Sequence, residues 1–289
     1  MWNKAVIFLA CVLIYFYKRS ARGEGTSILF YYKFFLYYFA TFIVTALCWP
    51  LFLLKPRNVQ NVMITVPIAK FVSRAINLRW IVRGGGVLSE DRGAVVVSNH
   101  QSSLDILEQL NIWDLAGKMT CIAKKELFYL WPFGLSAYLT GIVFIDRRKT
   151  KEAYKTMFAA SEVMTKDETK IWIFPEGTRN NNPEFLPFKK GAFNLAVASQ
   201  VPVIPVVFSP YHFLDIEKKT FKEGHVIIQC LEEVSTKGLT QEDVPALIEN
   251  VRNQMSIVYK QLAKEVMNDP PTKFNLLKNC STKARTLKD

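Results

Sequence analysis

The sequence predicts an α/β domain with a mostly parallel mixed sheet flanked by helices, preceded by hydrophobic membrane-anchoring helices. The first observation is that short apolar runs alternate with helix-length amphipathic segments from about residue 58 onwards. Strands that alternate with helices are typical of a parallel sheet. The second observation is that residues 1–57 hold two apolar stretches without a charged side chain. We therefore expect membrane-anchoring helices over 1–57, the α/β domain over 58–268 and a basic, disordered tail over 269–289.

The two N-terminal apolar stretches differ in length. Ala5–Tyr17 is short for a spanning helix and is compatible with a signal-anchor, a signal peptide or an interfacial helix. No small-x-small cleavage site precedes the basic residues that follow it, which favours retention of the segment. Phe34–Leu54 runs for 21 residues without a charge. That length is sufficient to cross a bilayer, and a buried core helix is the alternative.

The domain that follows is expected to contain seven strands and five helices. Apolar runs of four to six residues predict the strands Leu78–Val82, Ala94–Ser98, Met119–Ala123, Ile142–Ile145, Ile171–Phe174, Val203–Phe208 and Val226–Leu231. Helical periodicity predicts the helices Val59–Ile76, Ser103–Leu115, Lys151–Thr165, Gly191–Ser199 and a last one ending near Met267. Thr240 and Asp243 have the spacing of a capping box at the start of this last helix.

The overall charge indicates an anionic partner. The 289 residues include 37 Lys and Arg against 25 Asp and Glu, a formal net charge of +12. Nucleic acid, an anionic membrane surface and phosphorylated small molecules all fit such a charge. No zinc-finger spacing or RNA-binding signature is present, which makes nucleic acid the weakest of the three. The five cysteines are scattered without a Cys-x-x-Cys pair, which argues against a disulfide framework and a zinc site.

His100 and Asp105 form the first candidate site, directly after the expected strand Ala94–Ser98. Residues five apart on one helix point away from each other, so the two meet only if His100 lies in the loop and Asp105 in the first helical turn. Ser102 or Ser103 as the helix N-cap supports that placement. The alternative is structural: Asp105 satisfies the helix end, and His100 is an ordinary loop histidine.

Three basic clusters also follow strands or open a helix. Arg147 ends one expected strand, where ligands of open α/β sheets bind. The segment Glu176-Gly177-Thr178-Arg179 follows another strand and combines a flexible glycine with a fixed positive charge. Lys189 and Lys190 lie at the start of an expected helix, which is a ready anion site. For each cluster the alternative is a solvated basic loop.

These blocks, taken together and in order, resemble the glycerolipid acyltransferases. The matching residues are Asn99, His100 and Asp105, then Lys124–Leu127, then Phe144–Arg147, then Glu176–Arg179, and last Val201–Pro205. The chain is similar to the 1-acyl-glycerol-3-phosphate acyltransferases, also called lysophosphatidic acid acyltransferases. The resemblance runs from about residue 60 to about residue 210. The spacing before Pro132 leaves open whether Lys124 or Lys125 takes the lysine position of the family.

The resemblance implies transfer of a fatty acyl group from acyl-CoA to the sn-2 hydroxyl of 1-acyl-glycerol-3-phosphate, giving phosphatidic acid and CoA. His100 is implied as general base and Asp105 as the group that orients it. The residues implied to bind substrate are Asn99, Lys124, Lys125, Arg147, Glu176, Gly177, Thr178, Arg179, Lys189 and Lys190. Neither metal nor cofactor is implied. The implied location is the endoplasmic reticulum membrane, with the catalytic domain facing the cytosol.

Two alternatives stay open on sequence alone. Within the class, the acceptor is glycerol 3-phosphate or another lysophospholipid; outside it, the chain is a non-catalytic protein that binds lipid or acyl-CoA. One geometric expectation also follows from the implied site. Leu127–Phe144 carries no charge, yet it cannot span a membrane, because His100 and Arg147 would then lie on opposite sides of it.

Overall fold

The computed structural model describes residues 27–146 and 164–268, together with the single positions 11, 14, 15, 18, 148, 149, 156, 159, 161 and 162. Four predictions fall wholly or largely outside the described residues. They concern the apolar segment Ala5–Tyr17, the placement of Arg147, the helix Lys151–Thr165 and the tail 269–289.

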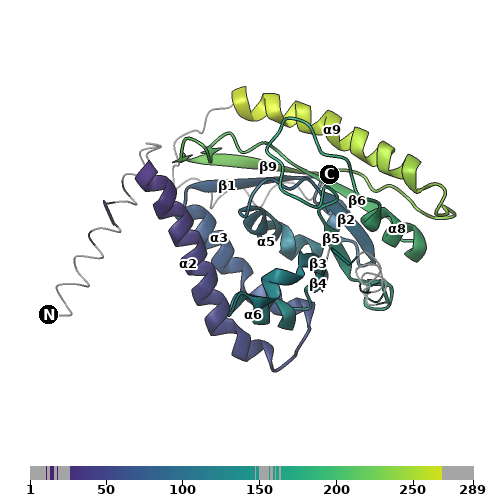
Figure 1. The fold of residues 1–289 in the computed structure, drawn as a ribbon, viewed down its shortest axis with the longest axis horizontal. Helices are drawn as coiled ribbons and strands as arrows, with labels where there is room; N and C mark the ends of the chain where they lie inside the picture. The colour runs from purple at the N-terminus through teal and green to yellow at the C-terminus, as the bar shows by residue number, and fades with distance from the viewer. Residues whose placement is uncertain are drawn as a thin grey trace, which may run out of the picture.

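A mixed sheet forms the centre of the described domain (Figure 1). Its seven strands lie in the order β1-β9-β6-β2-β5-β3-β4. All neighbours pair in parallel except β6 and β9, so β1 and β9 run opposite to the other five strands. The strands are β1 (Leu78–Arg83), β2 (Ala94–Ser98), β3 (Met119–Lys124), β4 (Val143–Ile145), β5 (Lys170–Ile173), β6 (Val203–Phe208) and β9 (Gly224–Cys230). The predicted fold class is confirmed.

Helices cover both faces of the sheet, and the alternation of side chains along β2 shows how. Val96 packs into the core beneath α3 (Val66–Ala75) and α5 (Asp105–Ala116). Its neighbours Val95 and Val97 point to the other face and pack with α8 (Lys190–Ser199) and α9 (Val244–Asn268). Because β2 is covered on both faces, every residue in it is apolar apart from its last, and all are buried.

The remaining elements are short. They are the 3-10 turns η1 (Val59–Ile64) and η2 (Lys125–Tyr129), the helices α4 (Gly86–Ser89) and α6 (Phe133–Leu139), and the hairpin strands β7 (Leu214–Asp215) and β8 (Thr220–Phe221). The predicted helix Val59–Ile76 is therefore two elements that meet at Thr65, the N-cap of α3. Pro67 explains the division, because proline lacks a backbone N–H and fits best at the first turn of a new helix.

The capping prediction for the last helix needs a correction. Asp243 accepts hydrogen bonds from the backbone nitrogen and the hydroxyl of Thr240, at 2.7 and 3.0 Å. These contacts close a turn that precedes the helix, and α9 begins only at Val244. Thr240 and Asp243 therefore form a turn as expected, but this turn ends before the first residue of α9 instead of forming its first turn.

The helix α2 (Ser27–Phe52) lies along the domain (Figure 1). Among the described residues it is the one helix that is long and apolar enough to cross a membrane. One of its faces packs on the domain, where Phe30 and Tyr37 join the main core and Phe52 packs with Leu139 of α6. Lys33 on the same face donates a hydrogen bond of 2.9 Å to the carbonyl of Lys222. The apolar stretch therefore has a protein-facing side that hydropathy alone did not reveal.

Leu127–Phe144 does not form one continuous helix. The segment folds into the end of η2, the helix α6 and most of strand β4, which pairs with β3 inside the sheet. As described, this uncharged run therefore contains no helix long enough to cross a membrane, in agreement with the expectation.

Candidate active site

His100 and Asp105 meet at the carboxyl end of β2, as the sequence predicts. His100 Nδ1 lies 2.6 Å from Asp105 Oδ2. The Asp105 side chain is only 1% exposed, whereas that of His100 is 20% exposed. Because a carboxylate can only accept, this contact assigns the proton to Nδ1 and leaves the lone pair on Nε2. The imidazole is thus held by one nitrogen, and Nε2 takes no part in this contact.

Asp105 accepts three further hydrogen bonds. The backbone nitrogens of Gln101 and Ser102 donate to it at 2.7 and 2.8 Å, and the Tyr211 hydroxyl donates at 2.9 Å. With His100, four donors surround the buried carboxylate. Asp105 is thereby fixed in one orientation before any substrate binds.

The predicted N-cap is wrong. The residue in the N-cap position of α5 is Leu104, and neither Ser102 nor Ser103 caps the helix end with its side chain. The Ser102 hydroxyl instead accepts a hydrogen bond of 3.3 Å from the Leu104 nitrogen, within the loop. The loop is closed by the Asp105 carboxylate, which turns back onto the nitrogens before it. His100 and Asp105 meet as expected, but hydrogen bonds from the loop backbone to Asp105 bring them together, and no serine N-cap is involved.

Glu176 fixes the backbone around His100. Its Oε1 accepts a hydrogen bond of 3.3 Å from the His100 nitrogen, and its Oε2 accepts from Asn180 Nδ2 and the Leu186 nitrogen, both at 2.9 Å. The Asn180 nitrogen in turn donates to the His100 carbonyl at 2.7 Å. Glu176 is buried, with both oxygens engaged by the protein. Glu176 therefore holds the loop, and its expected contact with substrate stays a prediction.

Asn99 is also engaged by the protein. Its Nδ2 donates to the Phe208 carbonyl at 3.1 Å, and its Oδ1 accepts from the Phe208 nitrogen at 2.9 Å. Asn99 is buried and joins the loop after β2 to the last residue of β6. One N–H and one lone pair of the Asn99 carboxamide are thus used to hold the loop, and contact of Asn99 with substrate stays a prediction.

The ring of His100 stacks on Phe174, with centroids 4.0 Å apart and an angle of 17° between the planes. Asp105 holds the edge of the imidazole, and Phe174 covers its face, so the two contacts together restrain rotation of the ring. Phe174 and Tyr211 are two residues that sequence reasoning missed. Phe174 precedes the block that ends at Arg179 and could have been noticed there, whereas nothing in the sequence links Tyr211 to Asp105.

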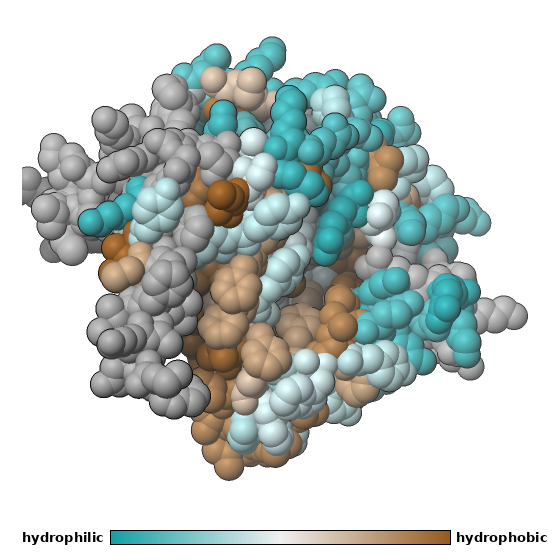
Figure 2. Space-filling model, turned by 60° about the vertical axis from the view of Figure 1, so that its left-hand side comes forward, coloured by the Kyte–Doolittle hydropathy of each residue, from teal (hydrophilic) through white to brown (hydrophobic). Residues whose placement is uncertain are grey.

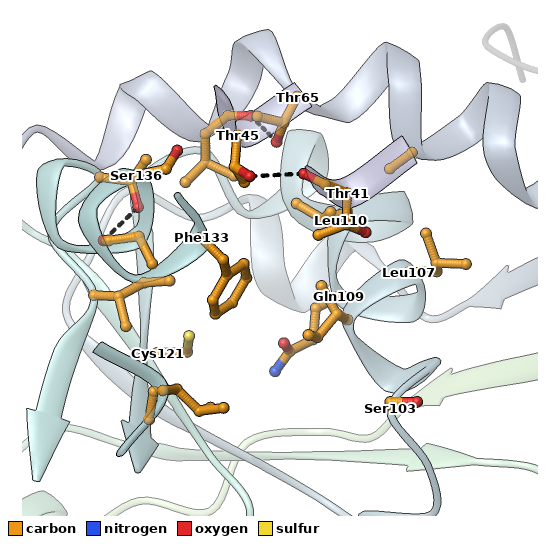
Figure 3. Close-up of a pocket in the computed structure, with 18 of the residues that line it drawn as sticks. Thr41, Thr45, Thr65, Ser103, Leu107, Gln109, Leu110, Cys121, Phe133 and Ser136 are labelled. Carbon is orange, nitrogen blue, oxygen red and sulfur yellow. Dashed lines mark hydrogen bonds between the residues drawn. The ribbon is translucent and has the colours of Figure 1, made fainter. Parts of the chain in front are cut away.

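A cavity of about 670 Å³ opens beside His100. Figure 3 shows its walls, with Thr41 and Thr45 from α2, Gln109 from α5 and Phe133 from α6 around the same space. The threonine hydroxyls are turned away, since Thr45 donates at 2.8 Å to the Thr41 carbonyl and Thr41 donates to the helix backbone in the same manner. The lining is mainly apolar, and its polar members include His100, Gln109, Lys124 and Arg179. Such a cavity suits a hydrocarbon chain.

The predicted cationic residues divide into two groups. Lys124, Arg179 and their neighbours Gly177 and Thr178 line the cavity together with His100. Arg179 is exposed, and it has no ion pair within the part of the chain that the structure describes. The second group comprises Lys125, Lys189 and Lys190, which are exposed and do not line the cavity.

Gly177 connects the second group to the first. Its φ of +70° lies in the left-handed region, which favours glycine. A Cβ at this position would lie 2.6 Å from Lys189 Nζ, so the lysine side chain passes directly over the glycine. The chain thus places the Lys189 ammonium beside the loop that carries Arg179, although Lys189 itself lies outside the cavity wall.

Glu108 lies one helical turn beyond Asp105 and is fully buried. Burial raises the pKa of the Glu108 carboxyl well above its usual range, and the charge of Asp105 raises it further. The folded protein therefore keeps a proton on Glu108 that the unfolded chain releases above about pH 4.3. As the pH rises above that value, the free energy of unfolding falls, by up to about 1.4 kcal/mol per pH unit, until Glu108 ionises in the folded state.

Replacing this titrating group gives the first prediction. Glu108→Gln is expected to remove this loss of stability as the pH rises above about 4.3, because the amide stays neutral in both states. The measurement is urea unfolding of both proteins at several pH values in that range. Parallel pH dependence of the two would show that Glu108 is ionised in the fold.

The chain resembles proteins of known function. Residues 79–209 match the family model described as Acyltransferase. Human 1-acyl-sn-glycerol-3-phosphate acyltransferase alpha is 39% identical over 217 residues, which cover 75% of this chain and 76% of the relative. Human 1-acyl-sn-glycerol-3-phosphate acyltransferase beta is 41% identical over 238 residues, which cover 81% of this chain and 85% of the relative. The crystal structure of the 1-acyl-sn-glycerophosphate (LPA) acyltransferase PlsC from Thermotoga maritima is 25% identical, with a TM-score of 0.66 over 81% of this chain and 95% of that one.

The fold and the comparisons together define the class as an O-acyltransferase with an α/β domain. The chain belongs to the 1-acyl-sn-glycerol-3-phosphate acyltransferase family. The resemblance inferred from the sequence blocks is thereby confirmed.

Proposed function

We propose that this protein transfers a fatty acyl group from acyl-CoA to the sn-2 hydroxyl of 1-acyl-glycerol-3-phosphate, giving phosphatidic acid and CoA. The observation that carries the proposal is the His100 imidazole, oriented by a buried Asp105, at the wall of an apolar cavity that Arg179 also lines. The names of the human relatives give the acceptor. We place the reaction at the endoplasmic reticulum membrane, with the catalytic domain facing the cytosol.

In this mechanism His100 acts as the general base. Nε2 takes the proton from the acceptor hydroxyl while that oxygen attacks the thioester carbonyl. The C–O bond forms, the C–S bond breaks, and the imidazolium returns its proton to the departing thiolate. Asp105 stays ionised throughout and stabilises the imidazolium, as the carboxylate does in a serine-protease triad. The sequence of steps needs neither a metal nor a redox cofactor.

The acceptor phosphate is assigned to the cationic side of the site. Arg179 offers a planar guanidinium that can bind two phosphate oxygens at once. Lys124, on the same cavity wall, lies 3.5 Å from Glu126, an exposed pairing that a phosphate can displace at low cost. Lys125, Arg147, Lys189 and Lys190 are the further cations of the proposal and add to the attraction for phosphate and for coenzyme A.

The direct test is an assay of the purified protein with acyl-CoA and a panel of acceptors. We expect 1-acyl-glycerol-3-phosphate to give the highest kcat/KM, because it combines an acyl chain for the cavity with an unsubstituted phosphate monoester for Arg179. Equal use of glycerol 3-phosphate would show that the acyl chain of the acceptor is not recognised. Binding of acyl-CoA without turnover of any acceptor would indicate a non-catalytic lipid-binding protein.

Arg179→Ala gives the second prediction. Loss of a charge-assisted contact with phosphate is expected to raise KM for 1-acyl-glycerol-3-phosphate by roughly 10- to 100-fold, with a smaller change in kcat. The matched control is Arg74→Ala, since Arg74 is exposed on α3 and does not line the cavity. An equal change in both variants would assign the effect to net charge, and an unchanged KM in Arg179→Ala would contradict the phosphate contact.

A further inference from the structure

The segment Phe128–Trp131, here called the aromatic segment, carries four large apolar side chains in succession. Phe128 is 40% exposed, Tyr129 69%, Leu130 56% and Trp131 66%. Single exposed apolar residues are ordinary on a soluble protein, but a contiguous group marks a surface that binds a partner. The segment comprises the last two residues of η2 and the two residues that follow it, at the end of the molecule where α2 also ends (Figure 1).

The aromatic segment continues an apolar surface of α2. Trp131 contacts Phe42 of α2, with ring centroids 6.3 Å apart. Figure 2 shows hydrophobic residues gathered over the lower part of the molecule, whereas the upper part is largely hydrophilic. The exposed side chains of α2 in this region include Phe39, Phe42, Ile43, Leu47 and Leu51. The two elements therefore present one apolar surface rather than two separate patches.

Basic side chains border this surface. Lys124 and Lys125 precede the aromatic segment, and Lys55 and Arg57 follow α2; all four are exposed. Arg57 lies over the ring of Tyr138 in α6, 4.7 Å from its centroid, which brings the positive border close to the aromatic residues. Tyr and Trp are enriched where a protein meets the headgroup region of a bilayer, and Lys or Arg nearby is attracted to anionic lipids.

We propose that the aromatic segment inserts into the headgroup region of a lipid bilayer, as a second contact beside α2. The lipid surface accounts for the apolar centre, the Trp and Tyr residues and the basic border at once. Insertion fixes the tilt of the domain, since two separate elements then touch the same plane.

The insertion has a consequence for the cavity, and this part rests on the proposed function. Leu127 and Phe133 flank the aromatic segment in the chain, and both line the cavity. A bilayer in contact with the aromatic segment therefore adjoins the cavity wall. An acceptor lipid can then move its acyl chain from the bilayer towards His100 without exposing that chain to water.

The test compares two exposed positions on opposite sides of the sheet. Leu130 is 56% exposed in the aromatic segment, and Ile257 is 60% exposed on α9. Each is replaced by cysteine, in a full-length chain whose Cys11 and Cys280 are serine, and labelled with a fluorophore. The vesicles contain phosphatidylcholine with brominated acyl chains and phosphatidic acid. We expect bromine quenching at position 130 and none at position 257. A label at 130 that stays unquenched on vesicle-bound protein, or failure of the protein to bind these vesicles, would overturn the proposal.

A second pair of variants reports on function. Leu130→Glu is expected to lower kcat/KM about 10-fold or more for 1-acyl-glycerol-3-phosphate held in vesicles, since it removes an apolar anchor and adds a charge. With a short-chain acceptor dissolved as a monomer, the same variant should match the parent protein. Ile257→Glu should match it in both assays. Equal losses of Leu130→Glu in both assays would overturn the link to the bilayer. Quenching at 130 without turnover of any acceptor would contradict the proposed function alone.

Discussion

His100→Ala is expected to lower kcat by about 10²- to 10⁴-fold, the usual contribution of a general base. The hydroxyl would then have to lose its proton to water while it attacks the thioester. KM for both substrates should change little, because the imidazole contacts the reacting hydroxyl rather than the phosphate or the coenzyme. Steady-state kinetics with acyl-CoA and 1-acyl-glycerol-3-phosphate measure both constants.

The fold of His100→Ala should remain intact, which makes the result interpretable. The backbone of His100 is held by Glu176 and Asn180, and these contacts do not involve the imidazole. Thermal unfolding of the variant should therefore resemble that of the parent. Added imidazole should restore part of the turnover by occupying the space left on Phe174. A folded variant with near-normal kcat would refute the assignment of His100 as the base.

Asp105→Asn is expected to cost a comparable factor, about 10²- to 10⁴-fold in kcat, for a different reason. The carboxylate accepts from the His100 ring, two backbone nitrogens and the Tyr211 hydroxyl. An asparagine offers one acceptor oxygen and must turn its NH₂ group towards at least one of these donors. The imidazole then loses the partner that keeps its proton on Nδ1 and stabilises its charged form.

The control for Asp105→Asn separates orientation from folding. The amide leaves buried donors without acceptors, so the variant is expected to lose about 1–3 kcal/mol of stability as well. Turnover should therefore be measured at a temperature where both proteins are fully folded by circular dichroism. A double variant with His100→Ala should be little worse than either single one, because the two residues act as a unit. Additive losses would show that Asp105 acts independently of His100.

Much of the fold follows from local patterns in the sequence. Strands β2 and β6 have the predicted boundaries, since both are short apolar runs buried on two faces. Helix boundaries were predicted less well, as at Thr65 and Thr240, because turns that precede a helix use the same polar residues as helix caps. The polar residues near Thr65 and Thr240 indicate that a helix begins nearby, but they do not show at which residue it begins.

The sequence indicated which residues gather at the site better than it indicated the contacts that each of them makes. His100, Asp105 and Arg179 occupy positions suited to the chemistry expected of them. Asn99 and Glu176 were expected to bind substrate because of the resemblance to the acyltransferase blocks, and in the structure both bind backbone groups of neighbouring segments. Whether a polar side chain faces the substrate or holds a loop depends on contacts more than 70 residues away in the chain, at separations of 76 and 109 residues here. Local patterning carries no information about such contacts.

The hydrogen bonds between α2 and the catalytic loop have a practical meaning for handling this protein. The Tyr37 hydroxyl donates to the Ser103 carbonyl at 2.8 Å, and the Tyr38 hydroxyl lies 2.9 Å from Ser103 Oγ. Ser103 lies inside the loop that brings His100 and Asp105 together. The helix that is apolar enough to cross a membrane thus also holds the loop that carries His100 and Asp105. A water-soluble fragment that starts after α2 would give up part of the catalytic loop's support, so solubility and activity cannot be separated by cutting the chain there.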